Sequence, residues 1–266
     1  MRSALKRLAG KALAPFDLTI ARASGVDALK QRAGKGDLLA ERLPLVAALA
    51  PQAEPVVQAL AHSRAQLAQD VFALSETGFK RGGFFVEFGA ADGVYLSNTH
   101  LLEKHYGWTG VLAEPARVWR NALLANRACA IEQRCVWTTT GEMLAFNEAP
   151  ASELSTIDSF SGADWAHAER AGGERYTVAT VSLDDLLEDH RAPEIVDYLS
   201  IDTEGSEYDI LAAFDFSRRR FRVITCEHNF TPAREKIHAL LTAQGYERKF
   251  EALSQWDDWY VLRANA

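Results

Sequence analysis

A glycine turn between two apolar runs carries the clearest chemistry of this sequence. Residues 84–93 read Phe-Phe-Val-Glu-Phe-Gly-Ala-Ala-Asp-Gly, so an apolar strand passes directly into a turn with two glycines. A second apolar run begins at Gly110 and ends in Glu114, 25 residues after Gly89. A glycine turn lets the backbone approach a ligand, and a carboxylate at the tip of the next strand can bind two ribose hydroxyls. The pattern predicts a βαβ unit that holds a nucleoside-bearing cofactor.

The residues that the turn lacks distinguish between two cofactors. A dinucleotide fingerprint is Gly-x-Gly-x-x-Gly, in which amides at a helix N-terminus receive a pyrophosphate. Here Ala91 stands at the second glycine position, and Asp92 places a negative charge where two phosphates would lie. S-adenosylmethionine has no phosphate, and Glu87 and Asp92 would attract its sulfonium and ammonium groups. We expect S-adenosylmethionine, with NAD and a ligand-free turn as the alternatives.

Two further apolar runs end in clusters of polar residues. Residues 198–207 read Tyr-Leu-Ser-Ile-Asp-Thr-Glu-Gly-Ser-Glu, and residues 223–229 read Val-Ile-Thr-Cys-Glu-His-Asn. Ligands of open parallel sheets bind beyond the carboxyl ends of the strands. If the two strands are neighbours, one pocket gathers the side chains of Asp202, Glu204, Glu227, His228 and Asn229.

Three uses of this cluster are chemically sensible. If a hydroxyl accepts the methyl group, a base must remove its proton; His228 suits this role at neutral pH, with Asp202 or Glu204 orienting it or replacing it. Alternatively, Asp202 and Glu227 hold Mg²⁺ or another divalent ion, which acidifies the hydroxyl. The third use is structural: Glu204 and Glu207 complement the N-terminus of the next helix, and His228 is simply hydrogen-bonded.

The elements that must position these groups follow from a regular alternation of strand and helix after residue 83. Such alternation is typical of a parallel sheet with helices on both faces. Strands are expected at 83–89, 110–114, 129–135, 197–202 and 221–227. Helices are expected at 97–105, 116–126, 184–189, 206–213 and 231–244. Short extra strands are expected at 142–147 and 176–182, and an antiparallel pair at 246–252 and 257–263.

Two segments outside this alternation also bear on function. Pro51 and Pro55 divide residues 44–75 into two helices, the second over about 55–75. Residues 151–175 are polar and too long for a routine connection, which favours a lid or a disordered loop. Trp165 and Phe160 among its hydroxyls suit a sugar acceptor, although both aromatics could instead anchor the loop to the body.

Six motifs in order along the chain resemble the FkbM family of S-adenosylmethionine-dependent methyltransferases. They begin at Val86 (VEFGAADG), Leu96 (LSNTHLLE), Gly107 (GWTGVLAEP), Tyr198 (YLSIDTEGSE), Cys226 (CEHNF) and Asp257 (DDWYV). The resemblance covers about residues 63–263. It implies a Rossmann-like class I α/β fold with a mostly parallel seven-stranded sheet and helices on both faces. It also implies methyl transfer to oxygen, and the acceptor in this family is often a sugar or polyketide hydroxyl.

On this basis we predict a cofactor site that spans three strand ends. Its residues are Glu87, Gly89, Ala90, Asp92, Gly93, Asn98, Glu114, Pro115, Cys135 and Val136. The first five surround the methionine portion, and Ser97 or Asn98 begins a helix whose amides receive its carboxylate. Glu114 holds the ribose hydroxyls, and the backbone at Cys135 and Val136 flanks the adenine.

Charge and composition suggest how the domains are arranged and where the protein works. The 266 residues carry a net charge of −7, which argues against a nucleic-acid partner because phosphate binding needs a basic surface. Residues 1–42 nevertheless hold nine Lys or Arg against four Asp or Glu. We expect this basic extension to be followed by a helical lead-in at 43–80 and a methyltransferase domain at 81–266.

The basic extension has two interpretations. Residues 1–14 form a short amphipathic pattern that can lie on an anionic membrane surface, or they form a loosely attached extension. Three cysteines without a CxxC motif fit a reducing compartment, so we expect a cytoplasmic enzyme, peripheral at the inner membrane face if residues 1–14 bind lipid. The rival functions are an NAD-type oxidoreductase with a degenerate glycine loop and a non-enzymatic, membrane-associated carbohydrate-binding protein.

Overall fold

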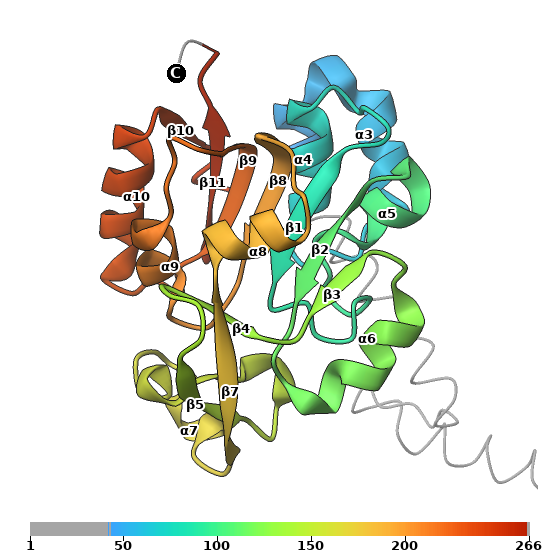
Figure 1. Cartoon of the computed structure of the whole chain (residues 1–266). Helices are drawn as coiled ribbons and strands as arrows, with labels where there is room; N and C mark the ends of the chain where they lie inside the picture. Colours follow the sequence, from blue (N-terminus) through green and yellow to red (C-terminus); the bar gives the residue numbers. More distant parts are fainter. Residues whose placement is uncertain (1–41, 43, 265–266) are drawn as a thin grey trace, which may run out of the picture. The chain divides into compact units, whose positions relative to one another are not determined.

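The computed structural model describes residue 42 and residues 44–264 (Figure 1). Its contacts divide the chain into two compact units, residues 1–48 and Leu49–Ala266. In the first unit, residue 42 and residues 44–48 are described, and they are helical. The predicted amphipathic stretch 1–14 therefore lies outside the described residues. Within the described part of the chain, no helix has both the length and the apolar character needed to cross a bilayer.

A seven-stranded sheet forms the centre of the second unit, in the order β10-β11-β9-β8-β1-β2-β3. Neighbouring strands are parallel except where β11 pairs with β9 and with β10. The predicted class I methyltransferase fold is confirmed, with a mixed sheet. The strands are β1 (Phe84–Phe88), β2 (Thr109–Ala113), β3 (Ala130–Glu132), β8 (Ile195–Ile201), β9 (Arg220–Glu227), β10 (Tyr246–Lys249) and β11 (Asp257–Leu262).

The strand order places a switch point between β1 and β8. From β1 the chain proceeds outward through β2 to β3, and from β8 it proceeds the opposite way through β9. Open α/β sheets bind ligands at such a point, beyond the carboxyl ends of the strands. Because β11 is antiparallel, its first residue Asp257 lies at this same edge, opposite Glu227 of β9.

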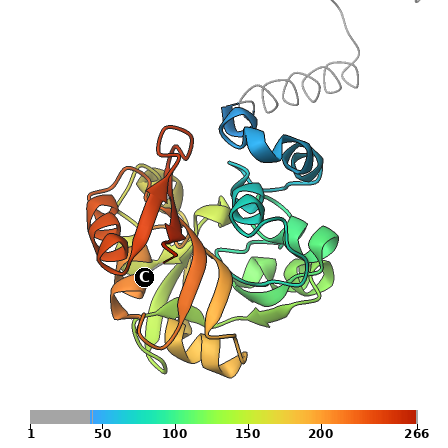
Figure 2. The ribbon, with the colours of Figure 1, turned by 90° about the horizontal axis from the view of Figure 1, so that it is seen from above.

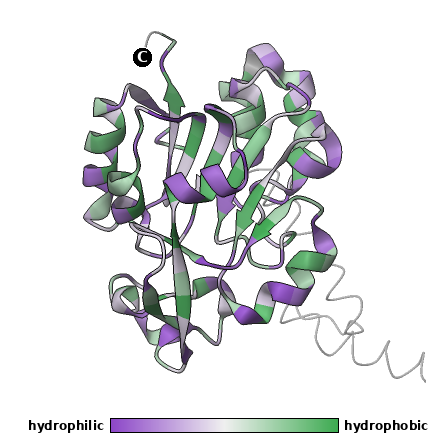
Figure 3. Cartoon of the chain, in the orientation of Figure 1, coloured by the Kyte–Doolittle hydropathy of each residue, from purple (hydrophilic) through white to green (hydrophobic). Residues whose placement is uncertain are grey.

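Helices cover both faces of the sheet (Figure 2). The helices are η2 (Ala50–Gln52), α3 (Ala53–Leu60), α4 (Gln69–Glu76), α5 (His100–Tyr106), η3 (Arg117–Trp119), α6 (Arg120–Asn126), α8 (Leu183–Asp189), α9 (Glu207–Ala213) and α10 (Ala233–Ala243). One core joins α8, α9 and α10, through Leu186, Leu211 and Leu241, to the face of β1 that carries Val86 and Phe88. On Figure 3 the central strands are correspondingly the most hydrophobic part of the chain, as expected for strands buried on both faces.

A smaller four-stranded sheet, in the order β4-β7-β5-β6, carries the segment that we predicted to face the acceptor. Instead of a disordered loop, residues 151–175 contain several short elements. The elements of this lobe are β4 (Cys135–Trp137), β5 (Met143–Glu148), η4 (Ser152–Leu154), β6 (Thr156–Ile157), η5 (Asp158–Phe160), α7 (His167–Arg170) and β7 (Glu174–Ser182). The two extra strands predicted at 142–147 and 176–182 are confirmed as β5 and β7.

Two predicted elements are wrong. The helix expected over about 55–75 is broken between α3 and α4, because Ala68 adopts a left-handed φ of 63° and Gln69 Oε1 accepts a hydrogen bond from the Leu67 amide. The strand expected over 129–135 is split into β3 and β4, which join different sheets. The amides of Gln133 and Arg134 both donate to Glu132 Oε1, and this turn redirects the chain.

Candidate functional site

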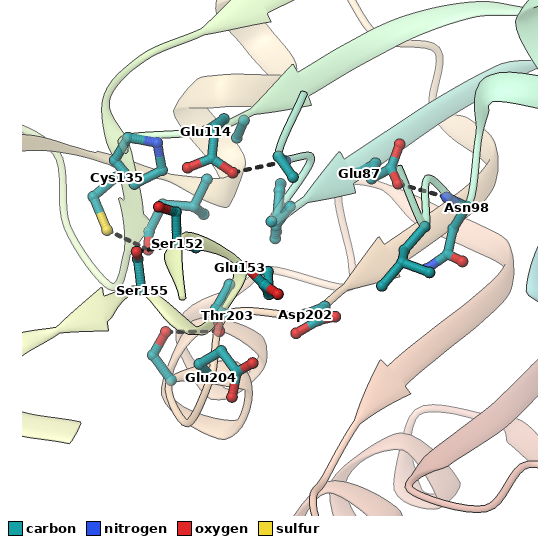
Figure 4. Close-up of a pocket in the computed structure, with 18 of the residues that line it drawn as sticks. Glu87, Asn98, Glu114, Cys135, Ser152, Glu153, Ser155, Asp202, Thr203 and Glu204 are labelled. Atoms are coloured by element: carbon teal, nitrogen blue, oxygen red, sulfur yellow. Dashed lines mark hydrogen bonds between the residues drawn. The ribbon is translucent and has the colours of Figure 1, made fainter. Parts of the chain in front are cut away.

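A pocket with an empty volume of about 990 Å³, here called the first pocket, opens at the carboxyl ends of β1, β2 and β8 (Figure 4). Among the described residues, no lysine, arginine or histidine lines it. The acidic residues that line it are Glu87, Glu114, Glu153, Asp202, Glu204 and Asp257. The lining of the first pocket is therefore acidic.

Glu114 follows the last residue of β2 and is held by the backbone. Its Oε2 accepts from the Ala91 amide at 2.9 Å, and its Oε1 accepts from the Ala116 amide at 2.8 Å. Burial raises the pKa of this carboxyl to about 7, and the two amides oppose that rise. Each carboxylate oxygen still has a lone pair for a further donor, so Glu114 can accept two neighbouring hydroxyl groups.

The turn after β1 packs directly against the end of β8. Gly89 has a φ of +72°, and a Cβ there would lie 2.1 Å from the Asp202 carbonyl oxygen. Only glycine fits this contact. Ala91, at the position that holds glycine in a dinucleotide fingerprint, also has a positive φ of 46°, and this conformation points its amide at Glu114.

Glu87 organises the start of α5. Its Oε1 accepts from the Asn98 amide at 2.7 Å, and its Oε2 accepts from the hydroxyls of Ser97 and Thr99. Burial raises the pKa of Glu87, and Arg127, whose Nη1 lies 3.8 Å away, lowers it. Ser97 Oγ in turn accepts from the amides of Thr99 and His100, but α5 begins at His100 with Thr99 as its N-cap, later than the start predicted at Ser97 or Asn98.

Asn98 presents an unused acceptor in the first pocket. Its Nδ2 donates to Ser200 Oγ at 2.9 Å, whereas its buried Oδ1 has no hydrogen-bond partner. Buried polar atoms are almost always paired, so an unpaired acceptor in a pocket points to a ligand donor. An ammonium group is one donor that would satisfy it.

An acid cluster, defined here as Asp202, Glu204 and Glu227, lies where β8 and β9 end. The two strands are parallel neighbours, as the sequence prediction required. Carboxylate oxygens of the three residues lie within 4.8 Å of one another. Burial raises the pKa of Asp202 to about 7 and that of Glu204 to about 9, and it also raises the pKa of Glu227. Crowding of like charges adds to these shifts.

One buried guanidinium reaches the acid cluster. Arg170 Nη2 lies 2.6 Å from Glu204 Oε2, and Nη1 lies 2.7 Å from Asp164 Oδ1. The Arg170 side chain is fully buried, and its Nε donates to the Leu154 carbonyl. Arg170 therefore ties the segment 151–175 to the end of β8 and partly balances the charge of Glu204.

Most of the predicted cofactor residues line the first pocket, but three do not. The ones that line it are Glu87, Gly89, Asn98, Glu114, Pro115, Cys135 and Val136. Ala90, Asp92 and Gly93 lie outside it. Asp92 Oδ1 instead accepts from the amides of Val94 and Tyr95 and closes the turn, while Gly93 packs against Leu123 and Arg127. The prediction that Asp92 faces the ligand is therefore not supported.

His228 and Glu227 lie on a second pocket, whose empty volume is about 570 Å³. His228 Nδ1 accepts from the Phe230 amide at 3.0 Å, and burial lowers the pKa of the imidazole. The structure thus does not bring His228 to the first pocket, because the chain turns away after β9, where the amides of His228 and Asn229 both donate to the Trp256 carbonyl. Asp202 and Glu204 remain in the first pocket.

Sequence reasoning assigned no cofactor-site role to Asp257, which lines the first pocket. Gln69 Nε2 donates to Asp257 Oδ2 at 2.8 Å, and burial raises the pKa of Asp257 to about 7. The acidic pair that opens the last strand was the available signal, since an antiparallel strand starts where its parallel neighbours end. Ser152 and Glu153 also line the first pocket, and they come from the smaller lobe.

Comparison with known proteins gives one family match. The family described as Methyltransferase FkbM domain matches residues 87–250. No curated protein sequence matches the chain.

Three solved structures are similar at low identity. A precorrin-6y C5,15-methyltransferase from Geobacter metallireducens GS-15 is 12% identical, with 68% of this chain and 72% of that chain covered and a TM-score of 0.39. A methyltransferase FkbM from Methylobacillus flagellatus KT is 13% identical, with coverages of 83% and 58% and a TM-score of 0.43. The METTL16 methyltransferase domain is 13% identical, with coverages of 71% and 63% and a TM-score of 0.35. This chain therefore spans less than two thirds of the last two.

Proposed function

The chain belongs to the FkbM methyltransferase family, and we propose that it transfers a methyl group from S-adenosylmethionine to a hydroxyl oxygen of a sugar, in a glycan or a glycosylated metabolite. The observation that carries the choice of cofactor is the lining of the first pocket, which has six acidic side chains and, among the described residues, no basic one. A sulfonium and an ammonium group are attracted by such a field, and a pyrophosphate is repelled. The NAD-type oxidoreductase is disfavoured for the same reason.

The residues of the first pocket fit the parts of S-adenosylmethionine. Glu114 can accept the two ribose hydroxyls, and the unpaired Oδ1 of Asn98 can accept from the ammonium group. Cys135 and Val136, both nearly buried, offer an apolar surface to the adenine. Gly89 lets the turn after β1 pack against the Asp202 carbonyl, and this contact brings the turn to the wall of the first pocket.

Bound S-adenosylmethionine would supply an electrophilic methyl group on a positively charged sulfur. When the acceptor oxygen forms its bond to this methyl group, the carbon–sulfur bond breaks and the hydroxyl proton must leave. Asp202 is the base we propose, since it lines the first pocket and its pKa, raised to about 7, suits proton removal near neutral pH. Glu204, held by Arg170, orients the acceptor or stabilises protonated Asp202.

A divalent cation at Asp202 and Glu227 is a second way to activate the hydroxyl. The donor set fits Mg²⁺, because three carboxylates with oxygens within 4.8 Å of one another are hard ligands. Arg170 already neutralises part of the charge on Glu204, which weakens this alternative. Turnover that is lost with EDTA and restored by Mg²⁺ would favour the cation over Asp202 acting alone.

Two measurements test the proposed function. Isothermal calorimetry of the full chain should detect saturable binding of S-adenosylhomocysteine and none of NAD; the reverse result contradicts the proposal. Incubation with methyl-labelled S-adenosylmethionine and whole-cell glycan or lipid extracts should then label a carbohydrate, identified by mass spectrometry as carrying an O-methyl group. Label on nitrogen or carbon would overturn the assignment of oxygen as the acceptor.

The basic extension completes the proposal. We place the enzyme in the cytoplasm, with residues 1–14 at the inner membrane face, on the basis of their amphipathic pattern. Binding to anionic vesicles should disappear when residues 1–42 are deleted. A non-enzymatic lipid-bound protein would show the same vesicle result without any binding of S-adenosylhomocysteine.

A further inference from the structure

The second pocket lies on the other side of the acid cluster from the first. Asp202 lines the first pocket and Glu227 lines the second, yet their carboxylate oxygens lie within 4.8 Å. The acid cluster therefore contributes residues to both pockets. The proposed cofactor contacts use none of the residues around the second pocket, which come from the acceptor-side lobe, from the loop between β8 and α9, and from the segment between β9 and α10.

Two exposed aromatic side chains stand at the rim of the second pocket. Trp165 follows the lining residue Asp164, and Phe230 lies between the lining residues Asn229 and Thr231. Their side chains belong to residues that are 62% and 69% exposed, and the Trp165 Nε1 donates to Asn229 Oδ1 at 3.4 Å. Trp165 comes from the smaller lobe and Phe230 from the turn after β9. The fold brings these two distant segments of the chain to the same pocket.

The turn that carries Phe230 has an unfavourable backbone conformation, which hydrogen bonds within the turn hold in place. Asn229 has a φ of 44° and Phe230 a φ of 56°, a left-handed conformation that is unfavourable for a bulky residue. Hydrogen bonds impose it: the Phe230 amide donates to His228 Nδ1, and the Thr231 amide donates to the His228 carbonyl. A strained, exposed aromatic that its neighbours hold outward points to recognition of a ligand.

The chemistry of the second pocket selects the kind of ligand. Among the described residues, no lysine or arginine lines it, so nothing there balances a phosphate or a carboxylate. Glu227 and Asn229, whose Nδ2 donates to Glu227 Oε2 at 2.8 Å, line this pocket, and their oxygens can accept further hydrogen bonds from hydroxyls. Aromatic faces beside hydroxyl-binding groups match a pyranose ring, which has apolar faces and polar edges.

We propose that the second pocket, with Trp165 and Phe230, binds an uncharged pyranose unit of the acceptor and brings it to the acid cluster from the side opposite the cofactor. This inference rests on the proposed function and adds where the acceptor sits and which residues recognise it. His228 is a positioning residue in this arrangement, because it holds Phe230 through the turn and does not face the first pocket.

Saturation-transfer NMR tests the proposal with a set of methyl pyranosides (glucoside, mannoside, galactoside and rhamnoside) added to the full chain and S-adenosylhomocysteine. The unchanged protein should transfer saturation to at least one sugar. Trp165→Ala and Phe230→Ala should each weaken that affinity about fivefold or more. Leu124→Ala, which removes another exposed apolar side chain from α6, should leave it unchanged. Absence of transfer to every sugar, or transfer that persists in both aromatic variants, overturns the proposal.

A second pair of variants tests the positioning role of His228. An asparagine side chain can still accept from the Phe230 amide, whereas alanine cannot. His228→Ala should weaken sugar binding and His228→Asn should largely restore it; equal losses in both would reject the role. Calorimetry with S-adenosylhomocysteine on the same samples tests the proposed function independently of sugar binding. If the unchanged protein does not bind it, the proposed function fails, whereas a sugar result alone bears only on the second pocket.

Discussion

Replacement of Glu114 by alanine tests the cofactor assignment most directly. The Glu114 carboxylate is the group we assign to the two ribose hydroxyls, and charge-assisted hydrogen bonds contribute about 1.5 to 3 kcal/mol each. Loss of both should weaken S-adenosylhomocysteine binding by about 3 kcal/mol or more, which is roughly 100-fold or more in Kd. The amides of Ala91 and Ala116 lose their acceptor too, but they lie at a pocket that water can enter. The free energy of unfolding should therefore change by about 1 kcal/mol or less.

Glu153→Ala is the matched control for this experiment. Glu153 lines the same pocket and carries the same charge, but it is exposed. Its removal should change the affinity by less than about 1 kcal/mol, the range of an exposed charge. Calorimetry on both variants separates hydroxyl recognition from the general negative field of the pocket. Equal losses in the two variants would attribute the effect to that field alone.

A chemical counterpart sharpens the same test. The unchanged protein should prefer adenosine over 2′-deoxyadenosine by about 1.5 to 3 kcal/mol, because one hydroxyl is missing from the second ligand. Glu114→Ala should bind both equally, since the partner of that hydroxyl is gone. If the variant keeps the preference, or binds S-adenosylhomocysteine as tightly as the unchanged protein, the ribose assignment is refuted.

Three further predictions follow from the turn and from the buried acids. Gly89→Ala should lower the melting temperature and abolish S-adenosylhomocysteine binding, because its Cβ would lie 2.1 Å from the Asp202 carbonyl oxygen. Gly107→Ala is the control for backbone strain alone, since Gly107 has a φ of +66° but no atom within 4 Å of an added Cβ. Equal effects of the two substitutions would contradict the steric argument. The pKa of Glu114 is raised to about 7, and its ionised form is the one that binds hydroxyls. The affinity for S-adenosylhomocysteine should therefore fall as the pH drops from about 8 to about 6. If the affinity of Glu114→Gln falls as steeply with pH as that of the wild-type protein, Glu114 is not the cause. The ligand-free protein should lose stability as the pH rises from about 4 to about 7. The reason is that the pKa of Asp257 is about 7 in the folded state, above its unfolded value, so folding favours the protonated form. Asp257→Asn should reduce the pH dependence of the melting temperature, and an unchanged slope would contradict this assignment.

The strand pattern and the glycine turn could be read from the sequence because both are local. A run of apolar residues buries both faces of a parallel strand whatever follows it, so the main strands appear close to their predicted places, except the one expected over 129–135. Gly89 and Glu114 were also predictable, since a strand tip and the next strand tip meet at one sheet edge in any βαβ unit. The number of residues between Gly89 and Glu114 is that of a βαβ unit, so the sequence already indicates that they lie close together.

The local sequence pattern could not predict which way the side chains point in the turns that follow the strands. Asp92 and His228 lie within a few residues of the first pocket along the chain, yet each turns its side chain to backbone amides instead. Whether a residue in a turn faces the cavity depends on one or two φ angles. Those angles are set by hydrogen bonds to distant residues, such as the Trp256 carbonyl that receives the amide of His228.

The sequence alone therefore determined the fold class, the glycine turn and the position of the Glu114 carboxylate after β2, because each depends on short-range patterns of burial and backbone freedom. Only the tertiary structure decided that Asp257 hydrogen-bonds Gln69 in the first pocket, that Arg170 pairs with Glu204, and that Trp165 reaches Asn229. These contacts join segments far apart along the chain. They form because an antiparallel strand and a separate small sheet return to one edge of the main sheet, and no local pattern specifies that return.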